Sequence, residues 1–211
     1  MPTSKETAEK RKSEIALKKA VSDIVSKRKN AKIEFGYALE LDGTVATMNR
    51  GGKSSCKITD SWDRVGVHNH PDSDLGAIGG TFSPADLASM YLTNRPINYA
   101  IDREYIYELR ALNWKPLGKN NYDGGRLKTA LELKDRYNKF IRNADAKSYN
   151  RAKELMQQGR FDKPDGTVDM KRYWGYQARM WHAMLGNWLK NHANEFGYEY
   201  HVHSIRAGGL K

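Results

Sequence analysis

The feature that most constrains the fold is an alternating run over residues 33–41 that ends at Asp42-Gly43. Every second residue of this run is apolar: Ile33, Phe35, Tyr37, Leu39 and Leu41. A period of two is that of a strand with one buried face. Asp-Gly is a strong signal for a tight hairpin turn, so the pattern predicts a return strand over residues 44–48. A chain with this hairpin must build a sheet around it.

The segment 33–117 continues as short strands and one helix. Strands are predicted over residues 55–59 and 64–69, and a closing hairpin over residues 97–101 and 105–112. Ser83 followed by Pro84 is a typical helix start, and we expect this helix to reach about residue 92. Residues 72–80 are rich in Asp and Gly and predict a mobile loop. The sequence therefore predicts an α/β core over residues 33–117.

Two regions flank this core. Residues 1–32 predict a basic N-terminal helix over about 4–30. Its thin apolar stripe would pack on the core or on a second chain, or stay partly disordered. Residues 118–211 predict a mostly α-helical region, with helices near 126–144, 147–158 and 168–195. In the last of these, Trp174, Trp181 and Trp188 recur every seven residues, which indicates packing rather than function.

The net charge of +11 is unevenly distributed along the chain. Residues 1–32 carry 10 Lys/Arg and 4 Asp/Glu (+6), residues 33–117 carry 8 and 11 (−3), and residues 118–211 carry 18 and 10 (+8). Basic flanks suit an anionic partner such as a nucleic acid, and ordinary solvated helix faces explain them equally well.

Other features of the composition narrow the class of protein. Cys56 is the single cysteine, so an internal disulfide framework is excluded. The sequence contains no run of about 18 apolar residues, so no membrane span is predicted. We therefore expect a cytoplasmic protein with no membrane partner. The sequence does not indicate an oligomeric state.

The chemistry of the chain is concentrated in Val67-His68-Asn69-His70-Pro71. On a strand, His68 and His70 point to the same side, and Asp86 can return from a later helix as a third ligand. Two imidazoles and one carboxylate suit Zn²⁺ and leave a fourth position for water, the usual layout of a hydrolytic site. Each piece alone has a plainer explanation. A His-x-His pair is usually structural, and Ser83-x-x-Asp86 is a good helix start without any metal.

Three motifs together resemble those of the JAMM/MPN-type zinc hydrolases: Glu34-x-Gly36, His68-x-His70-Pro71 and Ser83-x-x-Asp86. The form His-Asn-His-Pro is most similar to the RadC-like JAB branch of that superfamily and to related domains of phage and mobile-element proteins. The resemblance covers about residues 33–112. It implies a mixed sheet with flanking helices, and its roles for the site residues are as follows: His68, His70 and Asp86 as zinc ligands, Glu34 as general base and then acid, and Ser83 as hydrogen-bond donor to the oxyanion.

One departure from the family pattern lies between the second histidine and Ser83. Twelve residues, 71–82, separate them here, where the family usually has about seven. A surface loop can absorb the extra residues at small entropic cost. The loop could instead gate the site or misalign it, and it introduces Asp72 and Asp74 as rival ligands.

The resemblance implies a zinc-dependent metallopeptidase or isopeptidase that hydrolyses an amide bond of a protein or peptide substrate. Two alternatives stay open. One is a structural or assembly module of a phage or mobile element with the same fold and no protease activity. The other is a RadC-like DNA-associated protein that binds nucleic acid through its basic flanks. A second pair, His201-x-His203, lacks a carboxylate partner in the sequence pattern and is a weaker metal candidate.

Overall fold

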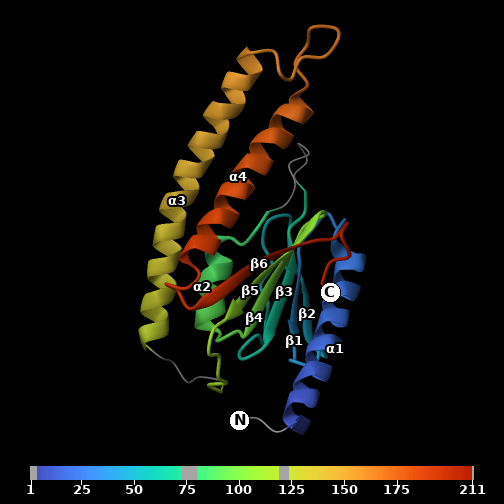
Figure 1. Ribbon diagram of the computed structural model, residues 1–211, viewed down its shortest axis with the longest axis vertical. Helices are drawn as coiled ribbons and strands as arrows, with labels where there is room; N and C mark the ends of the chain where they lie inside the picture. The colour runs from blue at the N-terminus through green and yellow to red at the C-terminus, as the bar shows by residue number, and fades with distance from the viewer. Residues whose placement is uncertain (1–3, 73–79, 119–123, 211) are drawn as a thin grey trace.

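The structure is a computed structural model that describes residues 4–72, 80–118 and 124–210 (Figure 1). It is a mixed α/β fold, which confirms the predicted class, with six strands in one sheet of order β2-β1-β3-β4-β5-β6. The strands are β1 (Phe35–Leu39), β2 (Val45–Arg50), β3 (Val65–Asn69), β4 (Ile97–Ile101), β5 (Tyr105–Ala111) and β6 (Tyr198–Ser204). The helices are α1 (Ser4–Arg28), α2 (Pro84–Leu92), α3 (Gly124–Gln157) and α4 (Met170–His192).

The sheet is mixed because one neighbouring pair of strands is parallel. β3 and β4 run parallel, and the other neighbouring pairs run antiparallel. A parallel pair needs a crossover connection, and α2 lies in that connection. The predicted hairpins β1–β2 and β4–β5 are both present, since each pair has a continuous antiparallel register apart from one irregularity near Leu39.

Helix α1 covers one face of the sheet. Leu17, Val21, Ile24 and Val25 are buried in a cluster with the inward-facing side chains of β1, β3 and β4. Of the three outcomes expected for the apolar stripe, packing on the core is the one observed. Ile15 does not take part, because it is 69% exposed. The apolar stripe of α1 therefore forms part of the hydrophobic core.

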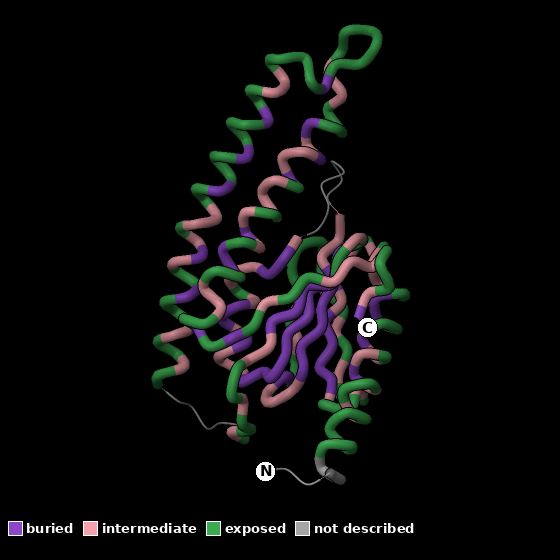
Figure 2. Tube along the Cα trace, viewed as in Figure 1, coloured by how far each residue is buried: buried purple, intermediate pink, exposed green. Residues whose placement is uncertain are grey.

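The opposite face of the sheet is covered by α2, α3 and α4 (Figure 1). Figure 2 shows the central strands as a continuous buried layer between the two sets of helices. The largest apolar cluster lies here and includes Leu133 and Tyr137 of α3 with Leu185 and Trp188 of α4. Strand β6 follows α4 and pairs with β5, so the last strand of the chain completes the same sheet.

The long helices α3 and α4 form an antiparallel hairpin that projects beyond the sheet (Figure 1). A small cluster of Ala152, Phe161 and Tyr173 joins their far ends. The tryptophan stripe packs as predicted. Trp188 is buried in the large cluster, Trp181 packs against that cluster, and Trp174 packs against the small one.

Two predicted elements are wrong. Residues 55–59 form no strand, because side chains of β2 hydrogen-bond to the backbone of Thr59. Asn49 Oδ1 accepts from the Thr59 amide at 3.0 Å, and Thr47 Oγ1 donates to the Thr59 carbonyl at 2.8 Å. The helices predicted near 126–144 and 147–158 are the single helix α3. Ala144 and Ser148 at the expected break are fully buried, so tertiary packing overrides the local signal.

The loop predicted over residues 72–80 falls mostly on residues 73–79, which lie outside the described residues. None of the helices in the described ranges combines the length and the apolar character that a membrane span requires.

Candidate metal centre

Strands β1 and β3 bring Glu34 and His68 to the same face of the sheet. Gly36 and His68 are direct partners in the β1–β3 register, and Ala100 lies opposite His68 on β4. Small neighbours leave space around the imidazole. Glu34 precedes Gly36 by two residues, so its side chain lies on the face that carries His68. This is the face covered by α2.

His70 lies directly after β3 and keeps the alternation of the strand. Its amide donates to the Ile101 carbonyl at 2.7 Å, which extends the pairing between β3 and β4. Its ring atom Nδ1 lies 2.5 Å from the Gly80 carbonyl oxygen. Because a carbonyl only accepts, we assign the proton of the neutral ring to Nδ1. The lone pair of Nε2 then faces His68 and Asp86.

Asp86 is held by the start of α2. Ser83 is the N-cap of this helix, and the two residues form a reciprocal capping box. Asp86 Oδ2 accepts from the Ser83 amide at 2.7 Å and from Ser83 Oγ at 2.7 Å, while Ser83 Oγ accepts from the Asp86 amide at 3.2 Å. The predicted helix start is confirmed, and it leaves Asp86 Oδ1 facing Nε2 of His68.

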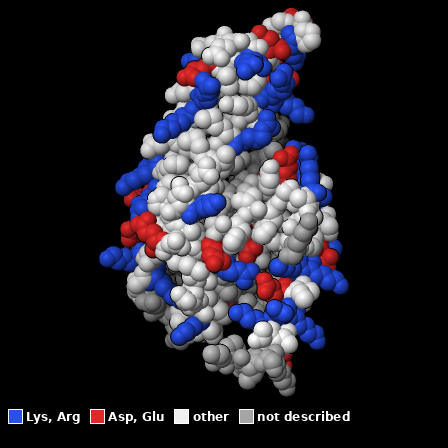
Figure 3. Space-filling view, in the orientation of Figure 1, with Lys and Arg blue, Asp and Glu red and all other residues white. Residues whose placement is uncertain are grey.

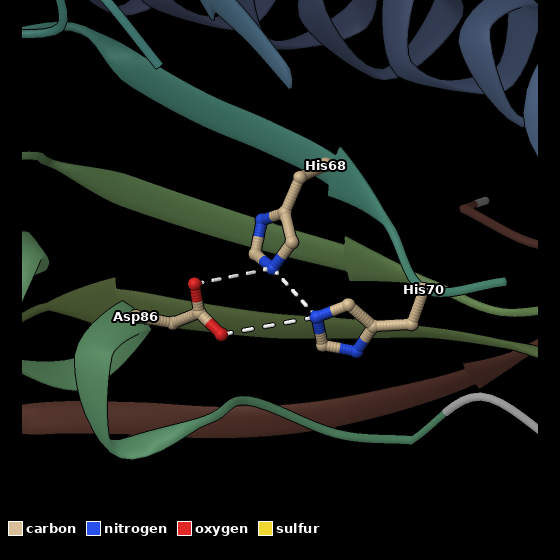
Figure 4. A group of neighbouring side chains, drawn as sticks. All are labelled: His68, His70 and Asp86. Atoms are coloured by element: carbon tan, nitrogen blue, oxygen red, sulfur yellow. Dashed lines mark hydrogen bonds and ion pairs between the residues drawn. The ribbon is translucent and has the colours of Figure 1, made fainter. Parts of the chain in front are cut away.

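His68 and His70 at the end of β3 converge with Asp86 of α2 (Figure 4). Nε2 of His68 lies 3.0 Å from Nε2 of His70 and 3.4 Å from Oδ1 of Asp86. Nε2 of His70 lies 3.8 Å from Oδ2 of Asp86. One ligand atom from each residue lies within 4.8 Å of the others, and within the described residues this is the group that could hold a metal ion.

The donor set fits a metal better than it fits a hydrogen-bonded cluster. With the His70 proton on Nδ1, Nε2 of His70 and the Asp86 carboxylate are both hydrogen-bond acceptors. A proton on His68 Nε2 can be donated to only one of these two acceptors. Within the described part of the chain, His68 Nδ1 is buried and has no hydrogen-bond partner. Two tetrahedral ligands at zinc bond lengths lie about 3.3 Å apart. The separations from His68 Nε2 to His70 Nε2 (3.0 Å) and to Asp86 Oδ1 (3.4 Å) are close to that spacing.

The electrostatics keep His70 and Asp86 in the forms that bind a cation. Burial and the neighbouring His68 lower the pKa of His70 from 6.5 to about 4, so its ring is neutral at physiological pH. Burial acts to raise the pKa of the Asp86 carboxyl, but the two imidazoles and the hydrogen bonds from His68 and Ser83 outweigh it. The pKa of Asp86 therefore lies well below its usual range, and Asp86 is anionic.

Glu34 is a buried carboxylate beside this cluster. It is 7% exposed, so it does not lie on a solvated face of the sheet. Burial is the main cause that raises its pKa, the charge of Asp86 adds to this, and His68 together with the Cys56 amide acts against it. A carboxylate with a raised pKa near a metal group is suited to proton transfer.

A cleft of about 1050 Å³ opens over the cluster. Glu34, His70 and Ser83 line one end, and side chains of α3 and α4 line the other. The site is therefore accessible, and the helical hairpin forms part of its wall.

Asp72 and the second histidine pair do not join the cluster. Asp72 forms an ion pair with Arg103 at 2.9 Å, and Asp74 lies outside the described residues. His203 contacts Glu108 at 3.0 Å, and His201 contacts Glu199 at 3.4 Å, both through Nε2. Each of these histidines meets one carboxylate, and they join no third ligand within the described ranges.

Three residues near the site carried no signal in the sequence. Gly80 supplies the carbonyl that orients His70, and the ring of His182 on α4 packs against Gly80. Arg95 is 5% exposed, and burial lowers its pKa to about 10 although the charge of Asp86 acts to raise it. Contacts between residues so far apart in the chain have no local pattern that could reveal them.

Comparisons with known protein families, with curated proteins and with solved structures found no match for this chain.

Proposed function

We propose that the protein is a zinc-dependent hydrolase of amide bonds, of the JAMM/MPN type that its motifs resemble. The observation that carries the proposal is the convergence of His68, His70 and Asp86 beside the buried carboxylate of Glu34, at the end of an open cleft. A bound zinc ion would supply a Lewis acid that activates water and polarises the substrate carbonyl.

Glu34 is the proposed proton carrier of this site. It lines the cleft, and its raised pKa brings the carboxyl closer to neutral pH than that of an exposed glutamate. Such a group can accept a proton from the attacking water and return it to the leaving amine. Its burial favours transfer because the protonated form costs less to hold in a dry site.

Ser83 has a structural task that accompanies its proposed oxyanion role. Its hydroxyl donates to Asp86 Oδ2 at 2.7 Å, so in this arrangement it orients a ligand. Ser83 also lines the cleft, and a rotated hydroxyl would point its proton at a substrate oxygen there. The oxyanion role is a proposal that depends on this rotation.

The test combines metal analysis with one substitution. Protein purified without chelator should contain about one zinc per chain. Glu34→Gln should keep the metal and lower peptide cleavage by roughly a hundred-fold or more, the usual contribution of a general base. Absence of zinc would refute the proposal. Bound zinc with no cleavage by the unmodified protein would favour the assembly-module alternative.

A second candidate function is nucleic-acid binding by α3. The outer face of this helix carries exposed Lys128, Lys139, Arg142 and Lys153, of which Lys139 also pairs with Asp135. Figure 3 shows lysine and arginine side chains distributed along the helical hairpin. Affinity for duplex DNA that falls steeply between about 50 and 200 mM salt would support it, and no binding at about 50 mM salt would remove it.

A further inference from the structure

The cleft at the candidate metal centre continues between α3 and α4. One side of α4 faces it with Trp174, Ala178, Trp181 and Leu185, which we call the α4 wall. Steps of four, three and four residues place these side chains on one helical face. Trp174 and Trp181 are partly exposed, whereas Ala178 and Leu185 are buried.

Further apolar groups extend the α4 wall around the hollow. Ile141 of α3 and Phe82, which precedes α2, line the same cleft. Phe82 is 1% exposed and lies 6.2 Å from His68 between ring centres, so apolar surface reaches the metal-centre residues themselves. A substrate with its reacting group at His68 and His70 would therefore place an adjacent side chain on apolar surface.

Polar and charged groups also line the cleft. Gln177 and Asp145 sit together at the hairpin, where Gln177 Nε2 donates to Asp145 Oδ1 at 3.4 Å. Glu34 and Asp72 add two further carboxylates to the lining, and Lys32 and Lys53 add two cations. The cleft therefore carries charges of both signs.

We propose that the α4 wall selects polypeptide substrates with a large apolar side chain next to the amide bond that is cut. This inference rests on the proposed hydrolase function. Contact with the tryptophan rings removes apolar surface of Phe or Leu from water, which is favourable. A charged side chain packed on the same rings would lose part of its hydration there. The α4 wall thus assigns a recognition role to the helical hairpin.

The test measures peptide binding separately from cleavage. Zinc-loaded full-length Glu34→Gln is titrated by calorimetry with short capped glycine peptides that carry one Phe, Leu, Lys or Asp. The Phe and Leu peptides should bind roughly ten-fold or more tightly than the Asp peptide. Trp174→Ala and Trp181→Ala in this background should reduce that ratio, and Trp181→Phe should retain it. Tyr149→Ala is the matched control, because Tyr149 is 44% exposed on α3 and does not line the cleft.

The outcomes separate the two proposals. Equal affinity for the Phe and Asp peptides, or no peptide binding up to millimolar concentration, would overturn the role of the α4 wall. Displacement of the Phe peptide by a single-stranded DNA oligonucleotide would do so in favour of a nucleic-acid ligand. The ratio of affinities for the Phe and Asp peptides is measured without any substitution in the α4 wall. A wall variant that misfolds therefore does not prevent the test. If the protein binds no zinc but still prefers the Phe and Leu peptides, the hydrolase proposal is refuted. Recognition of apolar peptides by the α4 wall would then still be supported.

Discussion

The imidazole of His182 occupies the space that a β-carbon on Gly80 would need. The Gly80 carbonyl accepts from Nδ1 of His70 at 2.5 Å, so a residue of α4 fixes the backbone that orients a proposed metal ligand. Groups that orient the ligands of a metal centre affect the metal almost as much as the ligands do.

This contact predicts the behaviour of a pair of substitutions. Gly80→Ala should weaken zinc binding by about 10- to 100-fold, because the new methyl group collides with His182 and moves the carbonyl. His182→Ala makes room, and the double variant should recover most of the loss. Affinity is measured by competition with a chromophoric chelator. Gly124→Ala is the control, because a β-carbon there meets nothing within 4 Å. A double variant that binds as weakly as Gly80→Ala would contradict the explanation.

Substitution of a proposed ligand should cause a loss of bound metal that substitution of the other histidine pair does not cause. His70→Ala and Asp86→Asn should each reduce the zinc content from about one per chain to near zero after dialysis. His201→Ala and His203→Ala should leave it unchanged, because those rings each meet one carboxylate. Plasma emission spectroscopy measures the content. Chelator should also lower the melting temperature of the unmodified protein but not that of Asp86→Asn.

The capping box predicts a stability effect that is independent of the metal. In metal-free protein, Ser83→Ala should lower the free energy of unfolding by about 1 kcal/mol, because the Asp86 amide loses its acceptor. Ser83→Thr should cost only a few tenths of a kcal/mol, because threonine keeps the hydroxyl acceptor of the N-cap. Urea unfolding measures both. Equal losses for the two variants would show that the cap bond is not what Ser83 contributes.

Asp102 predicts a pH dependence of stability. It is 1% exposed, and burial raises its pKa from 3.8 to about 6 against hydrogen bonds from Tyr107 and from the Tyr105 and Glu104 amides. Between these two values the folded state binds the proton and the unfolded state does not, so stability falls as pH rises, by about 3 kcal/mol in all. Above pH 6 the full loss is present.

Asp102→Asn should remove this slope and make the protein relatively more stable at pH 7.5 than at pH 4. Urea unfolding of metal-free protein across that range measures it. The difference between variant and unmodified protein is the quantity to compare, because His70, with a folded pKa of about 4, contributes the opposite slope below 6.5. A difference that does not change with pH would reject the raised pKa.

Helix α1 predicts a contrast between two neighbouring apolar residues. Leu17 is 2% exposed against the sheet, so Leu17→Ala should cost about 2–5 kcal/mol of unfolding free energy. Ile15 is 69% exposed, and Ile15→Ala should change stability by less than about 0.5 kcal/mol. Chemical denaturation measures both. Similar small effects would mean that α1 is only loosely attached.

The parts of the fold that could be predicted are those with a local signature. Alternation and Asp42-Gly43 predict the β1–β2 hairpin, because burial on one face and turn geometry act within a few residues. Ser83, Pro84 and Asp86 predict the start of α2 for the same reason. His68 and His70 follow from the pleat of a strand, so their shared face needs no tertiary knowledge.

The parts that could not be predicted depend on contacts between distant segments. Residues 55–59 have strand-like composition, but Asn49 and Thr47 engage Thr59 through side chains. The continuity of α3 is decided by α4, against which Ala144 is buried. The Gly80–His182 contact joins a loop to a helix about a hundred residues later, and chain separation of that kind leaves no periodic trace.

The pairing of β5 with β6 has a consequence for the order of folding. Both long helices lie between these strands in the chain, so the pairing closes a large loop and carries a high entropic cost. We expect this edge of the sheet to close after α3 and α4 have docked, and the same docking brings His182 to Gly80. We therefore expect the backbone around the candidate metal ligands to reach its final position late in folding, after β3 and α2, which carry those ligands, have formed.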